Sequence, residues 1–136
     1  MDKVRYGVIG CGMGRAHMFG IKENTTTELV AMCDINEEIL AKTSAEFPGV
    51  ATYTDYKDLL ADKNVDAVVI ATPDQLHCEM SIAALEAGKH VLCEKPFALK
   101  LEECKEMIEA TRKHPELKFM VGQIGRFTPG FLRLDR

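Results

Sequence analysis

The chain has 136 residues, of which 46% are hydrophobic and 28% are charged, and its net charge is −4. This length and composition favour one globular domain with a single core. The negative charge argues against nucleic-acid binding, which needs a basic stripe to neutralise phosphates. No run approaches the roughly 18 apolar residues of a membrane span, so we expect neither a nucleic acid nor a membrane as partner.

The five cysteines are scattered singly along the chain. Their number is odd and no C-x-x-C pair occurs, which argues against a disulfide framework and against a metal site. We expect reduced thiols in a cytoplasmic protein, most of them packed as small hydrophobic side chains. Cys11 differs from the others because it lies inside a glycine-rich loop.

Short apolar runs alternate with amphipathic stretches along the whole chain. The sequence predicts strands at 4–10, 28–34, 51–54, 65–72, 90–96 and 118–124, and helices at 13–22, 36–47, 55–62, 76–87 and 101–114. Asn36 and Asp55 stand where helix N-caps are expected, and Gly88 and Pro115 stand where helices end. The run 65–72 is apolar on both faces, which is typical of a central parallel strand.

This alternation predicts a single α/β domain with a doubly wound parallel sheet. In the second helix, Ile39, Leu40 and Phe47 share one face, which we expect to pack on the sheet. Ligands of such sheets bind beyond the carboxyl ends of the strands. The informative stretches therefore follow the strands: GCGMGR, CDIN, ATPDQLH, CEKPF and GQIGRF.

Residues 7–17, GVIGCGMGRAH, lie between the first strand and the first helix. They depart from the dinucleotide pattern G-x-G-x-x-G of Rossmann folds. Gly10 and Gly12 fit, whereas Gly14 comes one residue early and Arg15 takes the third glycine's position. Gly10 permits a tight turn, and Gly12 lets a pyrophosphate approach the amides at the helix N-terminus. Gly14 is small enough for the helix to pack closely on the sheet.

An acidic residue, Asp34, ends the second strand 24 positions after Gly10, where the fingerprint expects one at roughly 20. Its carboxylate can accept hydrogen bonds from both hydroxyls of an adenosine ribose and would repel a 2′-phosphate. Ile35 follows it, with no arginine beside it. We therefore expect NAD as the cofactor in preference to NADP. The alternative for Asp34 is an ordinary strand-end turn residue or a helix cap.

Two later stretches, ATPDQLH at 71–77 and CEKPFAL at 93–99, each follow a predicted buried strand. Together with the glycine loop and Asp34, they make the chain similar to the Gfo/Idh/MocA family of NAD(P)-dependent oxidoreductases over essentially its whole length. The likeness is strongest at E-K-P, residues 94–96. Asp74 replaces the Asn that the family usually has in T-P-N-x-x-H, and I-G-R-F replaces its common N-R-R-F.

The resemblance implies an NAD-binding Rossmann domain at 1–122 and the start of a connection to a second domain at 123–136. It implies a catalytic role for Lys95, whose ammonium group could stabilise a developing alkoxide near the nicotinamide or help to relay the proton of the substrate hydroxyl. The residues expected at the cofactor are Gly10, Cys11, Gly12, Met13, Gly14, Asp34, Ile35, Thr72, Pro73, Asp74, His77, Glu94, Lys95, Pro96 and Gln123.

Three smaller expectations concern histidines and one peptide bond. We expect His77 to begin a helix or to lie at the edge of the cofactor. His17, His90 and His114 are expected to be structural. The bond between Lys95 and Pro96 is expected to be cis, because the chain must turn sharply at the end of a buried strand.

Family members resemble one another in a C-terminal α/β domain that supplies the substrate pocket, and this chain ends at GFLRLDR, where that domain would begin. The implied function is the NAD-binding half of a dehydrogenase that transfers hydride between its cofactor and a sugar, polyol or related hydroxy compound. Two alternatives stay open: the same half of an NAD-dependent glycosidase, and a non-catalytic nucleotide-binding module. Apolar surface around Phe127, Phe131 and Leu132 leads us to expect a homo-oligomer.

Overall fold

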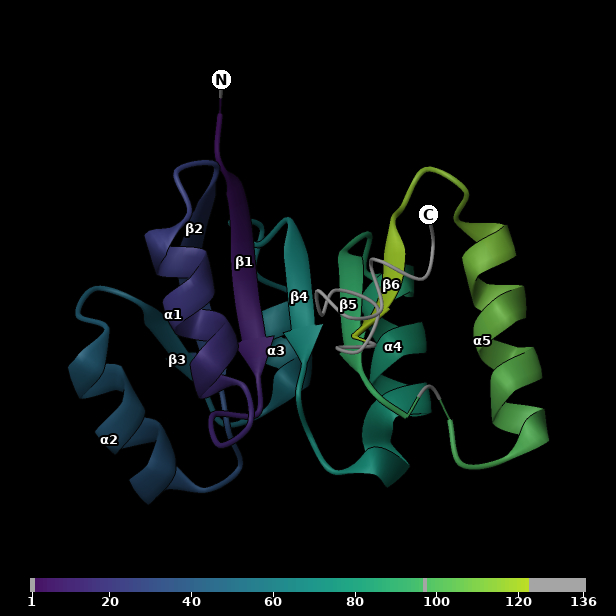
Figure 1. Ribbon diagram of the computed structural model, residues 1–136, viewed down its shortest axis with the longest axis horizontal. Coiled ribbons are helices and arrows are strands. Elements are labelled where there is room, and N and C mark those ends of the chain that lie inside the picture. Colours follow the sequence, from purple (N-terminus) through teal and green to yellow (C-terminus); the bar gives the residue numbers. More distant parts are fainter. Residues whose placement is uncertain (1, 97, 123–136) are drawn as a thin grey trace, which may run out of the picture.

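The computed structural model describes residues 2–96 and 98–122, which form a six-stranded parallel sheet with helices on both faces (Figure 1). The strands are β1 (Val4–Ile9), β2 (Thr27–Cys33), β3 (Ala51–Tyr53), β4 (Ala67–Ile70), β5 (His90–Glu94) and β6 (Phe119–Gly122). The helices are α1 (Arg15–Glu23), α2 (Glu37–Glu46), α3 (Tyr56–Leu60), the 3-10 turn η1 (Asp74–Leu76), α4 (His77–Glu86) and α5 (Leu101–Lys113). The expected doubly wound α/β fold is confirmed.

The strands follow the order β3-β2-β1-β4-β5-β6, so the direction of winding reverses between β1 and β4. These two strands pair in parallel, with Tyr6 opposite Ala67 and Ile9 opposite Ile70. Because every pairing is parallel, the carboxyl ends of the strands lie along one edge of the sheet. This edge carries the stretches that the sequence singled out.

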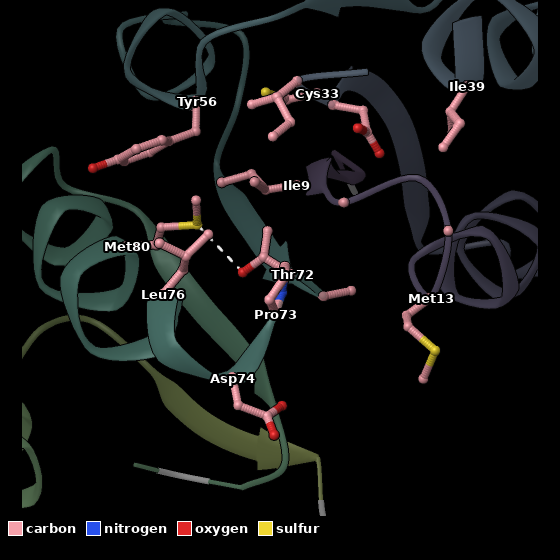
Figure 2. A pocket seen from close by; sticks show the side chains of 15 residues that line it. Ile9, Met13, Cys33, Ile39, Tyr56, Thr72, Pro73, Asp74, Leu76 and Met80 are labelled. Atoms are coloured by element: carbon pink, nitrogen blue, oxygen red, sulfur yellow. Dashed lines mark hydrogen bonds between the residues drawn. The ribbon is translucent and has the colours of Figure 1, made fainter. Parts of the chain in front are cut away.

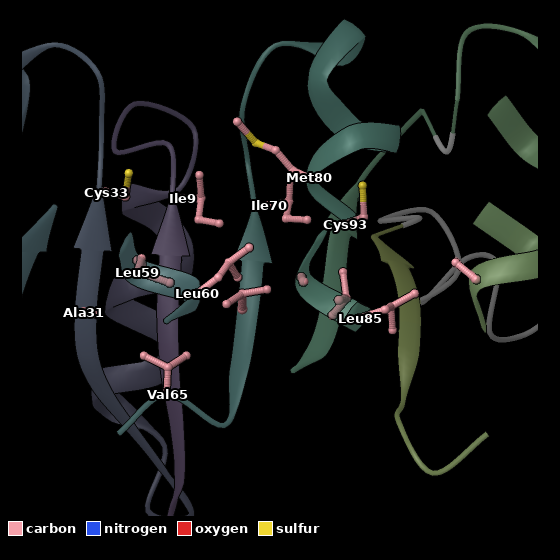
Figure 3. Packing of buried hydrophobic residues seen from close by; sticks show 14 residues of the cluster. Ile9, Ala31, Cys33, Leu59, Leu60, Val65, Ile70, Met80, Leu85 and Cys93 are labelled. Atoms are coloured by element: carbon pink, nitrogen blue, oxygen red, sulfur yellow. The ribbon is translucent and has the colours of Figure 1, made fainter. Parts of the chain in front are cut away.

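The core consists of two hydrophobic clusters, one on each face of the sheet. Alternate residues of a strand point to opposite faces, so Ile9 and Ile70 belong to the cluster under α3 and α4 (Figure 3), and Val8 and Val69 to the cluster under α1 and α2. All four residues of β4 are buried. The prediction of a central strand, apolar on both faces, is therefore confirmed.

Local sequence signals account for the ends of several helices. The Asn36 side chain accepts hydrogen bonds from the backbone N–H groups of Glu38 and Ile39, at 3.0 and 3.1 Å, and caps α2 as predicted. Asp55 caps α3 in the same way, accepting from the N–H of Lys57 at 2.9 Å. Gly88 follows α4 with a φ of 79°, in the left-handed region that favours glycine.

Two helix predictions need correction. The predicted helix at 76–87 begins instead as η1, and its regular α-helical part starts at His77. Leu40 and Phe47 are buried as expected, but Ile39 is 40% exposed. Ile39 lies in the first turn of α2, at the rim of a cleft beyond the strand ends, so it does not reach the sheet face.

The predicted connection at 123–136, with Gln123 and the three apolar residues that motivated self-association, lies outside the described residues. The domain boundary and the homo-oligomer stay predictions. No described helix is long and apolar enough to cross a membrane. All five cysteines are free thiols, and four of them are buried, as expected.

Candidate functional site

A cleft of about 530 Å³ opens beyond the ends of β1, β2 and β4, and we call it the β2–β4 cleft (Figure 2). Predicted cofactor residues line it: Gly10, Gly12, Met13, Asp34, Ile35, Thr72, Pro73 and Asp74. The other lining residues are mainly apolar: Ile9, Cys33, Ile39, Tyr56, Ala71, Leu76 and Met80. The cleft lies where the strand order reverses, which is where open α/β sheets bind their ligands.

The glycine loop brings α1 closer to β1 than a side chain at Gly14 would permit. A Cβ atom there would lie 2.1 Å from the carbonyl oxygen of Gly10 and 2.5 Å from Cγ1 of Val8. Gly10 itself has a φ of 99°, and its Cβ would lie 2.5 Å from the carbonyl oxygen of Ala71. Gly14 thus fills the packing role of the pattern's third glycine, although it comes one residue early.

Arg15, which takes the third glycine's place in the sequence, begins α1 and lies against α2. Its Nε and Nη2 atoms donate to the Glu46 carboxylate at 2.9 and 2.6 Å. Its guanidinium also lies over the ring of Phe19, 4.9 Å from the centroid. The arginine therefore ties the first two helices together.

Gly12 and Met13 form the tip of the loop. A Cβ atom on Gly12 would meet nothing within 4 Å, and Met13 is 74% exposed. Among the residues that the structure describes, the backbone N–H groups of these two have no acceptor. They precede α1, whose dipole adds partial positive charge at this end. Free amides, open space and a helix N-terminus together suit an anionic group such as a pyrophosphate.

Backbone amides on both sides hold the carboxylate of Asp34 in place. Its Oδ2 atom accepts from the N–H of Cys11 at 3.0 Å, and its Oδ1 atom accepts from the N–H of Asn36 at 2.9 Å. Each oxygen keeps a second lone pair, so the carboxylate can accept hydrogen bonds from two neighbouring hydroxyls. Ile35, 87% exposed, adds an apolar surface beside it.

Another cleft, of about 520 Å³, runs along one side of α1 over β1, β4 and β5 and reaches the end of β5, and we call it the α1–β5 cleft. Glu94 and Lys95 line it from β5 and from the loop that follows, and His17 lines it from α1. Lys95 is exposed, and its bond to Pro96 is cis, as expected. Met13 lines both clefts, so they are neighbours at the glycine loop.

His77 is the first residue of α4, as expected, and only 1% of its surface is exposed. Its Nδ1 atom lies 2.9 Å from the carbonyl oxygen of Pro96, and its Nε2 atom lies 3.0 Å from that of Thr72. The ring thus connects a loop of the β2–β4 cleft to the loop that carries Lys95. Direct contact of His77 with a cofactor stays a prediction.

His17 was not among the residues predicted at the site. Its Nε2 atom pairs with Oε1 of Glu94, 77 residues further along the chain. The side chains of His17 and Glu94 are 28% and 15% exposed. A sequence signal existed, because His17 falls in the first turn of the helix that follows the glycine loop and therefore lies near the strand ends.

The Cys11 side chain turns into the core, although its backbone belongs to the glycine loop. Its Sγ atom lies 3.6 Å from the carbonyl oxygen of Cys33. Burial, followed by the charge of Asp34, raises the pKa of the Cys11 thiol to about 11. Burial likewise raises the pKa of the Cys33 thiol to about 12. Both remain neutral thiols at physiological pH and are poor nucleophiles.

Comparison with known proteins identifies relatives of this chain. The sequence profile of the family described as "Oxidoreductase family, NAD-binding Rossmann fold" matches residues 4–123. An inositol 2-dehydrogenase from Saccharopolyspora erythraea is 39% identical over 135 residues, which cover 96% of this chain and 39% of that protein.

Two solved structures share the fold closely. Scyllo-inositol dehydrogenase from Lactobacillus casei, with bound NAD(H) and scyllo-inositol, has a TM-score of 0.92 and 29% identity, covering 98% of this chain and 40% of its own. The WlbA dehydrogenase from Bordetella pertussis, in complex with NADH and UDP-GlcNAcA, has a TM-score of 0.85 and 35% identity, covering 92% of this chain and 36% of its own. This chain thus spans between 36% and 40% of the length of these relatives.

Proposed function

This chain belongs to the Gfo/Idh/MocA oxidoreductase family and contains its NAD-binding Rossmann fold, and from that premise we propose that it holds NAD and presents Lys95 for hydride transfer between the cofactor and a sugar or polyol. The observation that carries the proposal is the meeting of two clefts at Met13. A dinucleotide has two nucleoside halves joined by a pyrophosphate. The two clefts, which have Met13 of the glycine loop as a common lining residue, suit that shape.

The residues of the β2–β4 cleft fit the adenosine half. Asp34 has lone pairs for the two ribose hydroxyls. The exposed Ile35 and Ile39, the latter labelled in Figure 2, offer an apolar rim for a base. The free amides of Gly12 and Met13 suit the pyrophosphate, which gains from the helix dipole as well as from hydrogen bonds. We assign the nicotinamide half to the α1–β5 cleft, beside Lys95.

When bound, NAD supplies the hydride chemistry at its nicotinamide ring, and the protein supplies position and charge. The ammonium group of Lys95 would donate a hydrogen bond to the substrate oxygen. As an alcohol is oxidised, that interaction stabilises the negative charge that develops on the substrate oxygen. The sugar or polyol class is proposed from the relatives named above, which include two inositol dehydrogenases and one dehydrogenase in complex with a sugar nucleotide.

The proposal is tested by titrating the 136-residue chain with NAD and with NADP in a calorimeter. We expect NAD to bind about tenfold or more tightly than NADP, because a 2′-phosphate would be placed beside the Asp34 carboxylate at a cost of at least about 1.4 kcal/mol. Asp34→Ala should weaken NAD binding and reduce the ratio of NAD affinity to NADP affinity. Asp58→Ala, at an exposed position of α3, is the matched control and should change neither. Tighter binding of NADP, or an unchanged Asp34→Ala variant, would contradict the assignment.

A further inference from the structure

Lys95 stands between two residues that are each bound by a histidine. Glu94, before it, pairs with His17 of α1, and Pro96, after it, has its carbonyl oxygen 2.9 Å from Nδ1 of His77. The two histidines come from different elements, α1 and α4, and both precede the loop in the sequence. Lys95 is thus flanked by one residue held through its side chain and one held through its backbone.

We propose that His17 and His77 are positioning residues for Lys95 and that they tie its position to the loops that bind the cofactor. The proposal rests on the function proposed above, because it takes Lys95 as the residue that faces the nicotinamide. Neither histidine needs to touch the cofactor or the substrate. Each acts through a neighbour of the lysine.

The His77 contact fixes backbone. The ring is almost fully buried, so it has little freedom to move, and its other nitrogen lies 3.0 Å from the carbonyl oxygen of Thr72. Thr72 lines the β2–β4 cleft. A displacement of the Thr72 loop is therefore passed through one imidazole to the peptide that follows Lys95. Both partners are carbonyl oxygens, which only accept, so a neutral ring donates to one of them and a protonated ring donates to both. The positioning role requires the donation from Nδ1 to Pro96.

The His17 contact fixes a side chain. Glu94 is largely shielded, and its Oε1 atom lies 3.4 Å from the place that a Cβ atom on Gly122 would occupy, so the carboxylate packs closely between α1 and β6. His17 lies in the first turn of α1, directly after the glycine loop. Movement of the loop tip at Met13 is thus passed along α1 to the residue that precedes Lys95.

Amide substitutions can distinguish a positioning role of the two histidines from a general effect on folding. The side-chain nitrogen of Asn occupies the place of Nδ1 in His, and that of Gln occupies the place of Nε2. His77→Asn keeps a donor toward Pro96, whereas His77→Gln keeps one toward Thr72 only. His17→Gln keeps a donor toward Glu94, whereas His17→Ala removes that contact. His77→Ala removes the contacts with both Pro96 and Thr72. His114→Ala is the matched control, since His114 also faces a glutamate, Glu116, but lies at the end of α5.

The readout is acetylation of Lys95 by an amine-selective reagent, followed by peptide mass spectrometry, with and without NAD. The exposed Lys57 serves as the internal reference. At NAD concentrations about ten times Kd, only the free fraction reacts, so a lysine covered by the cofactor is protected about tenfold. Calorimetry gives the NAD affinity of each variant, and circular dichroism confirms that it is folded.

We expect about tenfold protection in the wild type and in His114→Ala, and less than about twofold in His17→Ala and His77→Ala at the same saturation. His17→Gln and His77→Asn should restore at least half of the protection, and His77→Gln should not. If the alanine variants fold and protect Lys95 like the wild type, or if Gln restores His77 as well as Asn does, the positioning role is wrong. If NAD binds the wild type without protecting Lys95, or does not bind at all, the proposed function fails instead.

Discussion

Replacing Gly14 by Ala should destabilise the protein strongly, because no rearrangement of a flexible side chain can relieve the contact. The new Cβ atom would lie 2.1 Å from the backbone oxygen of Gly10 and 2.5 Å from Val8. Overpacking costs about 1–3 kcal/mol, and a clash with backbone belongs at the upper end, about 3 kcal/mol. Two smaller contributions to the free energy of unfolding roughly cancel: alanine lowers the entropy of the unfolded chain, which stabilises the fold, but it is a poorer N-cap than glycine, which destabilises it. For a domain of this size, the melting temperature should fall by about 10 °C.

Two other glycines nearby provide controls in the same assay, urea and thermal unfolding followed by circular dichroism. Gly20→Ala lies within α1 with nothing within 4 Å of the new Cβ, and should stabilise the protein by about 0.5–1 kcal/mol. Gly12→Ala, also in open space, should leave stability within about 0.5 kcal/mol and weaken NAD binding. A Gly14→Ala variant as stable as the wild type would refute the close approach of α1 to β1.

Two further predictions concern titratable groups. Burial raises the pKa of the Cys11 thiol to about 11 and that of the Cys33 thiol to about 12. A thiol reagent at pH 8 should therefore label the partly exposed Cys104 first. Rapid labelling of Cys11 in the folded chain would contradict the site geometry. Hydrogen bonds from Arg5 lower the pKa of the Asp66 carboxyl below its ordinary 3.8. The pair therefore stabilises the fold at pH values above 3.8, and this stabilisation is lost as the pH falls through the lower pKa that Asp66 has in the folded protein. In urea unfolding between pH 5 and pH 2.5, Asp66→Asn should therefore lose less stability than the wild type, and parallel curves would show that the pair contributes nothing.

The order of strands and helices and most of the strand-end site were predictable from the sequence, because the signals involved are local. Strands and helices differ in hydrophobic period, and caps such as Asn36 and Asp55 bind amides two or three residues away. Parallel strands joined by helices bring their carboxyl ends to one edge, so residues that follow strands meet there whatever the rest of the fold. This is why Asp34 and Thr72 were expected together and line one cleft.

Only the tertiary structure decided which of these residues touch. His17 meets Glu94 because α1, which packs on β1 and β2, has its first turn near the end of β5, a consequence of the tertiary packing and not of any spacing along the chain. His77 lies near Thr72, five residues before it, through a local turn, whereas it reaches Pro96 because β4 and β5 are neighbours in the sheet. The early Gly14 fits because the actual path of the loop leaves no room for a Cβ atom there, a distance that no pattern of glycines encodes. Contacts between residues far apart in sequence depend on how elements pack. A single sequence indicates which face of each helix or strand is apolar, but not which other element that face contacts.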